Sequence, residues 1–155
     1  MTDLTHLDSD GHARMVDVAD RAVTARTATA SGRVTTSATP LIRSGQVPKG
    51  DVLAVARIAG IMATKRTPDL VPLCHPIAVH GVQVDVAAAP DADEVRITAT
   101  VRTADRTGVE MEALTAVAVA GLAVIDMVKA VDPRAALRDV QVDAKDGGRS
   151  GAWSR

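Results

Sequence analysis

Charged side chains lie at both ends of one long apolar stretch, residues 107–130 (TGVEMEALTAVAVAGLAVIDMVKA). Glu112 lies near its start, and Asp126 and Lys129 lie near its end. A carboxylate and an ammonium group three residues apart become neighbours on a helix, where such a pair can exchange protons with a bound molecule. The competing interpretation is an ordinary solvated ion pair, which usually contributes little to stability.

This stretch is predicted to be one α-helix, because it consists of good helix formers without proline and ends before Asp132-Pro133. Glu112 and Asp126 lie on roughly the same side of it, and the opposite, apolar side carries Leu114, Val117, Gly121 and Ile125. At the rise of an α-helix, Glu112 and Asp126 are ~21 Å apart along the axis, so they cannot form a carboxylate pair in one chain. Either the site is long, or the two ends serve pockets shared between subunits.

The composition indicates a globular protein with an unusual core. Of the 155 residues, 46% are hydrophobic and 24% charged, but Phe and Tyr are absent and Trp occurs once. The core must therefore be aliphatic and thin, which favours further burial in a homo-oligomer. A net charge of −1 argues against a nucleic-acid or membrane surface. One cysteine excludes an internal disulfide, and the lack of a signal peptide or an uncharged apolar span predicts a cytoplasmic protein.

The rest of the pattern predicts an α+β fold. Alternation predicts strands over residues 24–36, 77–88, 94–104 and 136–144, with Gly81 as the place for a bulge. A helical turn is expected at 39–44, and Asp51 is predicted to cap a second helix over 52–66. The order matches a ferredoxin-like β-α-β-β-α-β sandwich, with an antiparallel sheet and its helices on one face. We predict one domain, residues 1–155, with flexible ends at 1–14 and 146–155.

Three prolines brace the segment Leu73-Cys74-His75 and predict an extended backbone at His75. Neighbouring side chains of an extended segment point to opposite sides, so Cys74 and His75 are not each other's catalytic partners. A histidine in so rigid a segment could serve a ligand or could be structural. The residues alone leave both interpretations open.

Common metal and nucleotide motifs are absent from the sequence. The four histidines lack metal-ligand spacing, so no metal site is expected. The GGRSG sequence at 147–151 lacks the lysine and the strand-to-helix context of a phosphate loop, and neither GxGxxG nor GxSxG occurs. What remains is a dispersed set of cations that suits a small polyanion such as a nucleoside triphosphate. These are Lys49, Lys65, Arg66, Lys129, Lys145 and Arg149.

Blocks that follow one another over nearly the whole chain closely resemble the cyclic pyranopterin monophosphate synthase (MoaC) family of molybdenum cofactor biosynthesis. The blocks are LTH (4–6), MVDV (15–18), KGD (49–51), ARIAGIMATKRT (56–67), PLCHP (72–76), TGVEMEALTA (107–116), DMVKAV (126–131) and GGRSG (147–151). Several of them are too long for a chance match.

The resemblance implies a ferredoxin-like fold assembled as a hexamer, a trimer of dimers, with active sites between subunits. It also implies a reaction, in which (8S)-3′,8-cyclo-7,8-dihydroguanosine 5′-triphosphate is converted to cyclic pyranopterin monophosphate with release of pyrophosphate. No cofactor is expected to be required, although Mg²⁺ could accompany the triphosphate.

Carried over residue by residue, the resemblance implies catalytic roles for Asp126 and Lys129. It implies substrate contacts for Leu73, Cys74, His75, Met111 and Glu112. Weaker candidates, for contacts to the triphosphate and the ring, are Lys49, Lys65, Lys145, His6 and Arg14. Two positions depart from many relatives, which carry an aromatic residue in place of Ile125 and a lysine in place of Arg149. Arginine keeps the charge but binds phosphate with a different geometry.

The alternative function is a non-catalytic ferredoxin-like module that binds a nucleotide or RNA. Sheet surfaces that read RNA need exposed aromatic residues for base stacking, and the predicted strands have none. An oligomeric scaffold is a second alternative, but it would leave both the proline-braced His75 and the Asp126–Lys129 pair unexplained.

Overall fold

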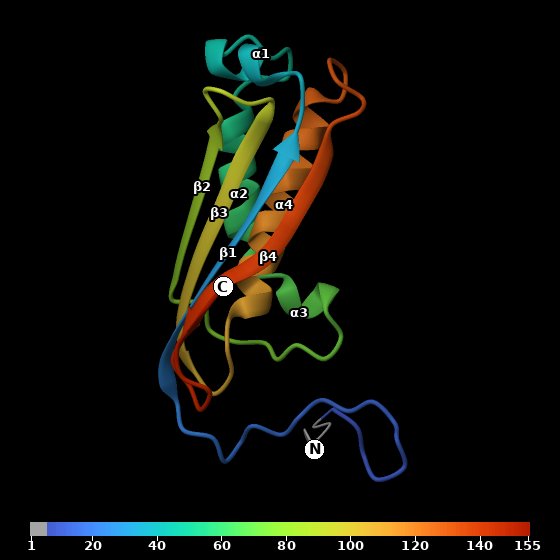
Figure 1. Cartoon of the computed structure of the whole chain (residues 1–155). Helices are drawn as coiled ribbons and strands as arrows, with labels where there is room; N and C mark the ends of the chain where they lie inside the picture. The colour runs from blue at the N-terminus through green and yellow to red at the C-terminus, as the bar shows by residue number, and fades with distance from the viewer. Residues whose placement is uncertain (1–5) are drawn as a thin grey trace.

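A five-stranded antiparallel sheet organises the molecule (Figure 1). The structure is a computed structural model that describes residues 6–155, so the first five residues of the predicted flexible start lie outside the described residues. The strands are β1 (Thr24–Thr35), β2 (Gly81–Ala88), β3 (Glu94–Asp105), β4 (Ala136–Asp146) and β5 (Trp153–Ser154). They lie in the order β2-β3-β1-β4-β5. The predicted α+β class with an antiparallel sheet is confirmed.

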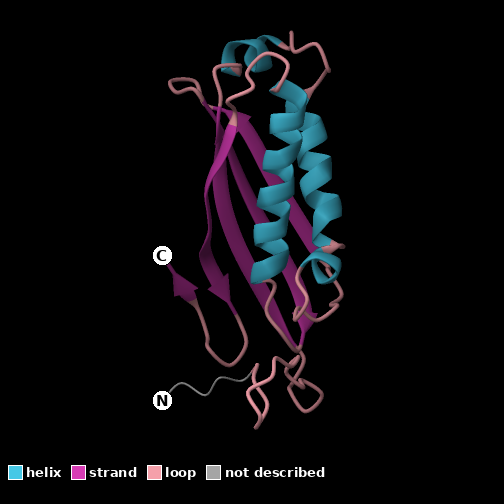
Figure 2. Ribbon diagram, turned by 90° about the vertical axis from the view of Figure 1, so that its right-hand side faces the viewer, coloured by secondary structure: helices cyan, strands magenta, loops and turns pink. Residues whose placement is uncertain are grey.

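Two long helices, α2 and α4, lie side by side on one face of the sheet (Figure 2). Within residues 6–155 the helices are α1 (Thr39–Ser44), α2 (Val52–Thr64), α3 (Thr67–Leu70) and α4 (Glu110–Val128). The predicted cap of α2 is confirmed, because the Asp51 carboxylate accepts a hydrogen bond from the Ala54 amide at 2.9 Å. Gly45, with φ +69°, ends α1 in the left-handed conformation that glycine favours.

Small residues let α2 and α4 approach closely. A Cβ atom added at Gly60 of α2 would lie 2.9 Å from the Ala116 carbonyl oxygen and 3.3 Å from the Ala120 Cβ of α4. At the other end of the pair, Lys49, just before α2, contacts Asp126 near the end of α4. The helices are therefore antiparallel, and α2 ends beside the start of α4.

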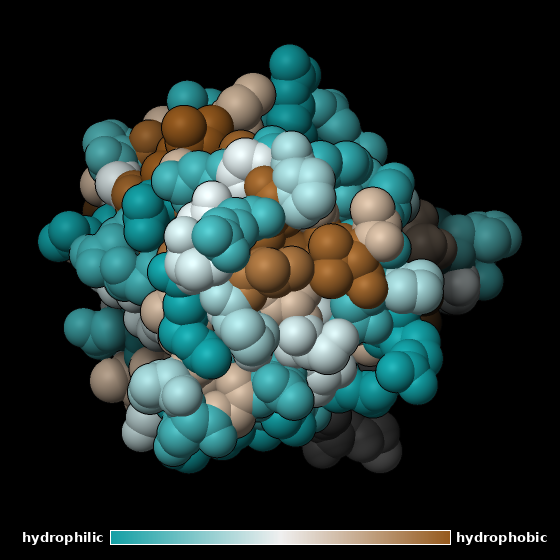
Figure 3. Space-filling model, turned by 90° about the horizontal axis from the view of Figure 1, so that it is seen from above, coloured by the Kyte–Doolittle hydropathy of each residue, from teal (hydrophilic) through white to brown (hydrophobic). Residues whose placement is uncertain are grey.

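The core is aliphatic, as the composition predicts. The largest fully buried apolar side chains are those of Ile97, Val34, Val95, Val101, Val109, Val117, Val124 and Val128. By length and composition α4 is apolar enough to cross a membrane, and half of its most apolar window is buried in the fold. Seen from the end that carries α1, apolar groups form separate patches among hydrophilic ones (Figure 3).

Some local features differ from the sequence prediction. β2 begins only at Gly81, which pairs with Arg102 in unbroken register, so the predicted bulge is wrong. The irregularities in the sheet lie between β1 and β4 instead. Thr67 and Pro68 begin the short helix α3, and near the C-terminus Lys145 pairs with Trp153 of β5. Local alternation cannot show such pairing, because it depends on where the chain returns.

Candidate active site

The predicted catalytic pair lies at the C-terminal end of α4. Lys129 Nζ is 2.7 Å from Asp126 Oδ1, which confirms the expected contact. Lys49 Nζ lies 3.0 Å from Asp126 Oδ2 and also donates to the Asp126 carbonyl oxygen at 2.8 Å. Hydrogen bonds from Lys129 first, and then from Lys49, hold the pKa of Asp126 below its ordinary value. Asp126 is therefore a charged carboxylate between two ammonium groups.

This cluster is open to solvent in the single chain. The exposed fractions of the side chains are 56% for Asp126, 60% for Lys129 and 41% for Lys49. Proton transfer to a reactive intermediate benefits from a site that excludes water. Such a site requires that something else cover this end of α4.

The other predicted contacts lie around the start of α4. Cys74 donates its S–H to Glu112 Oε1 at 3.7 Å, and His75 Nε2 lies 2.7 Å from the Val16 carbonyl oxygen. Cys74 and His75 thus have different partners, as the extended backbone predicts. Glu112 is only 1% exposed, although it lies opposite the predicted apolar side of its helix. The helical wheel misses this burial because the Cys74 segment contacts that side of α4.

A cavity of about 450 Å³ lies in front of this segment. Its wall contains five of the residues that the family resemblance selects: Leu73, Cys74, His75, Met111 and His6. Burial, and then the charge of Glu112, raise the pKa of the Cys74 thiol to about 11. The thiol is therefore protonated at neutral pH and is a poor nucleophile.

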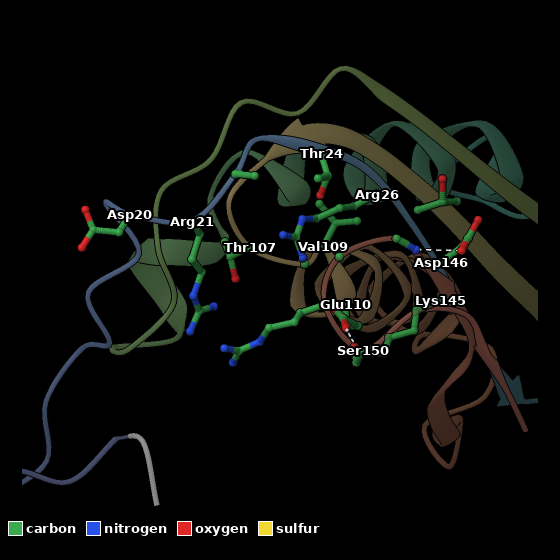
Figure 4. Close-up of a pocket in the computed structure, with 16 residues that line it drawn as sticks. Asp20, Arg21, Thr24, Arg26, Thr107, Val109, Glu110, Lys145, Asp146 and Ser150 are labelled. Carbon is green, nitrogen blue, oxygen red and sulfur yellow. Dashed lines mark hydrogen bonds and ion pairs between the residues drawn. The ribbon is translucent and has the colours of Figure 1, made fainter. Parts of the chain in front are cut away.

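A second cavity, of about 680 Å³, lies between the start of β1, the start of α4 and the C-terminal turn (Figure 4). Its charged lining residues are Arg21, Arg26, Lys145, Arg149, Asp20, Glu110 and Asp146. The two cavities share wall residues that include Arg21 and Glu110, so they adjoin, and together they are called the groove. Lys145 Nζ lies 3.1 Å from Glu110 Oε1, and no ligand is needed to hold it there.

The glycine-rich tail folds as a turn against Arg26 at one side of this groove. Gly147 and Gly148 have φ values of +93° and +73°, which favour glycine. A Cβ atom on Gly148 would overlap the Arg26 guanidinium group, whose Nε donates to the Asp105 carbonyl oxygen at 2.9 Å. The GGRSG sequence therefore shapes a groove wall that carries Arg26.

The structure brings the predicted site residues together in two groups rather than one. Lys145 lines the larger cavity, Glu112 lies behind Cys74, and Lys49 joins the Asp126 end. Lys65 and Arg14 are exposed and line neither cavity. Sequence reasoning missed the groove residues Arg21, Arg26 and Glu110. Arg26 could have been recognised from the sequence, because it is a cation in the first half of a strand that is otherwise rich in Thr and Ala.

One group in residues 6–155 has ligand atoms close enough to share a metal ion, namely Asp8, Asp10 and His12. Asp8 Oδ1 already accepts hydrogen bonds from the Asp10 and His12 amides, which accounts for the cluster as a turn of the chain. These residues line neither cavity of the groove.

Comparison with known proteins identifies the family. The MoaC family model matches residues 15–148. A cyclic pyranopterin monophosphate synthase of Streptomyces coelicolor is 64% identical over 154 residues, covering 98% of this chain and 89% of the relative. One of Nocardioides sp. is 62% identical, with 98% and 95% covered, and cyclic pyranopterin monophosphate synthase 2 of Mycobacterium tuberculosis is 56% identical, with 99% and 92% covered. This chain belongs to the MoaC family.

Proposed function

We propose that this chain is a cyclic pyranopterin monophosphate synthase of molybdenum cofactor biosynthesis. It converts (8S)-3′,8-cyclo-7,8-dihydroguanosine 5′-triphosphate to cyclic pyranopterin monophosphate and pyrophosphate. The observation that carries this proposal is the identity of 64% to a relative named for that enzyme, over almost the whole of both chains. The groove supports it, because cavities of several hundred Å³ suit a nucleotide-sized ligand.

The cationic end of the groove suits the triphosphate. Arg21, Arg26, Lys145 and Arg149 approach the larger cavity from two segments of the chain that are far apart in the sequence, 21–26 and 145–149. Cations on the β- and γ-phosphates would offset the charge that develops as pyrophosphate leaves. Mg²⁺ could accompany the triphosphate as a counterion, and we propose no resident cofactor.

The Asp126 cluster suits the proton transfers. The reaction must open the dihydropurine imidazole ring, close the pyranopterin ring and form the cyclic phosphate, and the ring steps need general acids and bases. Asp126 is charged, and Lys129 is one helical turn away in direct contact. We assign Lys129 as the proton carrier and Asp126 as its catalytic partner, with Lys49 as the second cation of the cluster.

One chain cannot bring both groups of residues to one substrate. Glu112 and Asp126 lie ~21 Å apart along the axis of α4, which exceeds the reach of side chains toward a single reacting ring. We propose that each active site combines the groove of one subunit with the Asp126 cluster of another. Half-exposed catalytic side chains would then be covered by the partner.

The outer face of the helix pair supports self-association. Four large apolar side chains there are 44–62% exposed: Val55, Ile58, Met62 and Leu122. Antiparallel packing of two such faces about a two-fold axis would bring the end of α4 in one subunit toward the start of α4 in the other. A hexamer built as a trimer of dimers, located in the cytoplasm, is the assembly we propose.

Turnover of the cyclised GTP substrate by the purified protein tests this function directly. Product is identified by mass spectrometry, and pyrophosphate is counted in a coupled assay, with and without a chelator. Stoichiometric product and pyrophosphate are expected in both conditions. Tight binding of the substrate without turnover would instead identify the alternative, a non-catalytic nucleotide-binding module.

A further inference from the structure

The last strand, β5, fastens the far side of the glycine-rich turn to β4. Trp153 of β5 pairs with Lys145 of β4. The Arg155 amide donates to the Asp143 carbonyl oxygen at 2.8 Å, and Arg155 Nε donates to the Val142 carbonyl oxygen at 3.2 Å. The Arg155 guanidinium also lies 5.7 Å from the centre of the Trp153 ring, within the range of a cation–π contact. β5 is short, but side chains as well as backbone groups hold it.

The first half of the turn has other contacts, whereas the second half depends on β5. Gly147 packs so closely on β1 that an added Cβ atom would overlap the Ala25 carbonyl oxygen. A Cβ atom on Gly151 would meet nothing within 4 Å in the described part of the chain. Between these glycines, the Ser150 hydroxyl accepts a hydrogen bond from Lys145 Nζ at 2.9 Å. Because glycines lose much conformational freedom when they are ordered, the second half of the turn must be held at its far end to keep one conformation.

This second half carries groups that face the larger cavity. Arg149 and Ser150 line that cavity, and so does Lys145, where the turn leaves β4 (Figure 4). Direct partners on antiparallel strands have Cβ atoms about 5 Å apart on one face of the sheet, so the Trp153 ring lies beside the Lys145 side chain. Trp153 itself lines neither cavity. It can therefore fix Lys145 and the turn without contacting a ligand.

We propose that β5 is a clasp for the cationic end of the groove: Trp153 and Arg155 are positioning residues that hold the glycine-rich turn at the wall of the larger cavity. With the turn held, Lys145 and Arg149 are in place before an anion arrives, and binding does not have to order the chain. That the anion is a triphosphate rests on the proposed function. β5 lies after residue 148, the last residue that the family model matches.

The docking of β5 can be observed without a ligand, because Trp153 is the single tryptophan of the chain. Trp153 is 44% exposed, so acrylamide should quench its fluorescence about half as fast in the folded protein as in urea. Arg155→Ala removes the side-chain contacts of β5 and should raise the folded rate toward the rate in urea. Arg138→Ala, which removes an exposed arginine at the other end of β4, is the matched control and should not change the rate. Equal quenching of folded and unfolded wild type would overturn the proposal.

The affinity for inorganic tripolyphosphate, measured by calorimetry, tests what the clasp does. Trp153→Ala should raise Kd about tenfold, because ordering the backbone of even one residue on binding costs roughly that much affinity. Trp153→Phe keeps an aromatic ring beside Lys145 and should stay within about threefold of wild type. Deletion of residues 152–155 should weaken binding at least as much as Trp153→Ala. Wild-type affinity in the deletion variant, or no binding of tripolyphosphate by wild type, would overturn the proposal.

Stability and assembly separate a positioning role from support of the fold. Trp153→Ala should keep its Tm within about 2 °C of wild type and its molar mass in light scattering, because β5 is a two-residue strand with exposed side chains. Unfolding or dissociation of this variant would show that β5 supports the fold or the assembly instead, and would overturn the proposal.

Turnover of the cyclised GTP substrate gives a further readout. Trp153→Ala should raise KM about tenfold and leave kcat within about threefold of wild type, because saturating substrate itself orders the turn. A lower kcat with unchanged KM would contradict the clasp. If wild type has no turnover, the proposed function fails, while the quenching and tripolyphosphate results still decide the role of β5.

Discussion

Replacing Gly60 by alanine tests whether the close approach of α2 and α4 is as tight as the structure shows. The added Cβ would lie 2.9 Å from the Ala116 carbonyl oxygen, a backbone atom that cannot move without shifting α4. Overpacking of this kind costs about 1–3 kcal/mol, and the better helix propensity of alanine returns about 1 kcal/mol. Since α2 and α4 together position both groups of site residues, the variant should also lose activity as the helices separate.

Gly121→Ala is the matched control, because it places the same methyl group on the same helix pair against a different neighbour. Its Cβ would meet the end of the Leu137 side chain, which can rotate away. The gain of about 1 kcal/mol in helix propensity should offset the rearrangement and leave its stability near that of wild type. With the gain in helix propensity subtracted from the overpacking cost, Gly60→Ala should be less stable than Gly121→Ala by up to about 2 kcal/mol, which corresponds to a Tm difference of up to about 8 °C in a chain of this size.

Thermal unfolding followed by circular dichroism measures both variants. Gly60→Ala is expected to melt below both wild type and Gly121→Ala. If Gly60→Ala is as stable as Gly121→Ala, the helices are not packed backbone to backbone at this point, and the reasoning from their contact is wrong.

Further changes test other parts of the account. Asp126→Asn should lower turnover at least about 100-fold without changing Tm, as loss of an acid–base partner does; most activity remaining would remove Asp126 from catalysis. Lys145→Met should weaken triphosphate binding about 10–100-fold by calorimetry, whereas Arg96→Met, at the far end of β3, should not. Hydrogen bonds from the Ser37 amide first, and then from the Thr36 hydroxyl, lower the pKa of Asp132 in the folded protein. The Asp132 carboxylate therefore stabilises the fold fully above the ordinary pKa of an aspartate, and this stabilisation is lost as the pH falls through the lowered pKa of the folded state. The urea midpoint of Asp132→Asn should therefore fall below wild type at pH 7 and converge with it in acid, and a pH-independent difference would contradict this linkage.

The elements of the fold were predictable where the sequence has a strong local period. The alternation in β3 and the run of helix formers in α4 determine those elements, and Asp51 marks the start of α2 as a cap should. β5 and α3 were not predictable, because a two-residue edge strand and a one-turn helix have too few residues to show a period.

The candidate site was predictable in its residue types but not in its arrangement. The spacing of Asp126 and Lys129 on one helix predicts their contact, but the third member, Lys49, is 77 residues away from Asp126 in the chain. Arg26 faces the groove because β1 lies beside the C-terminal turn, and no local pattern encodes that pairing. Glu112 is buried by a segment that comes 38 residues earlier, which a helical wheel cannot include.

Subunit mixing tests most directly whether separate chains share each active site. Asp126→Asn inactivates the acid–base end, and a double variant, Arg26→Ala with Lys145→Ala, inactivates the groove end. The two proteins are unfolded together in urea and refolded as an equal mixture, and each is refolded alone as a control. In two-fold pairs with sites shared across the interface, half of the pairs contain both variants and each has one intact site, so turnover should recover to about a quarter of the wild-type value. Recovery to that level is the result we expect, and a mixture no more active than its two components would contradict a site built from two subunits.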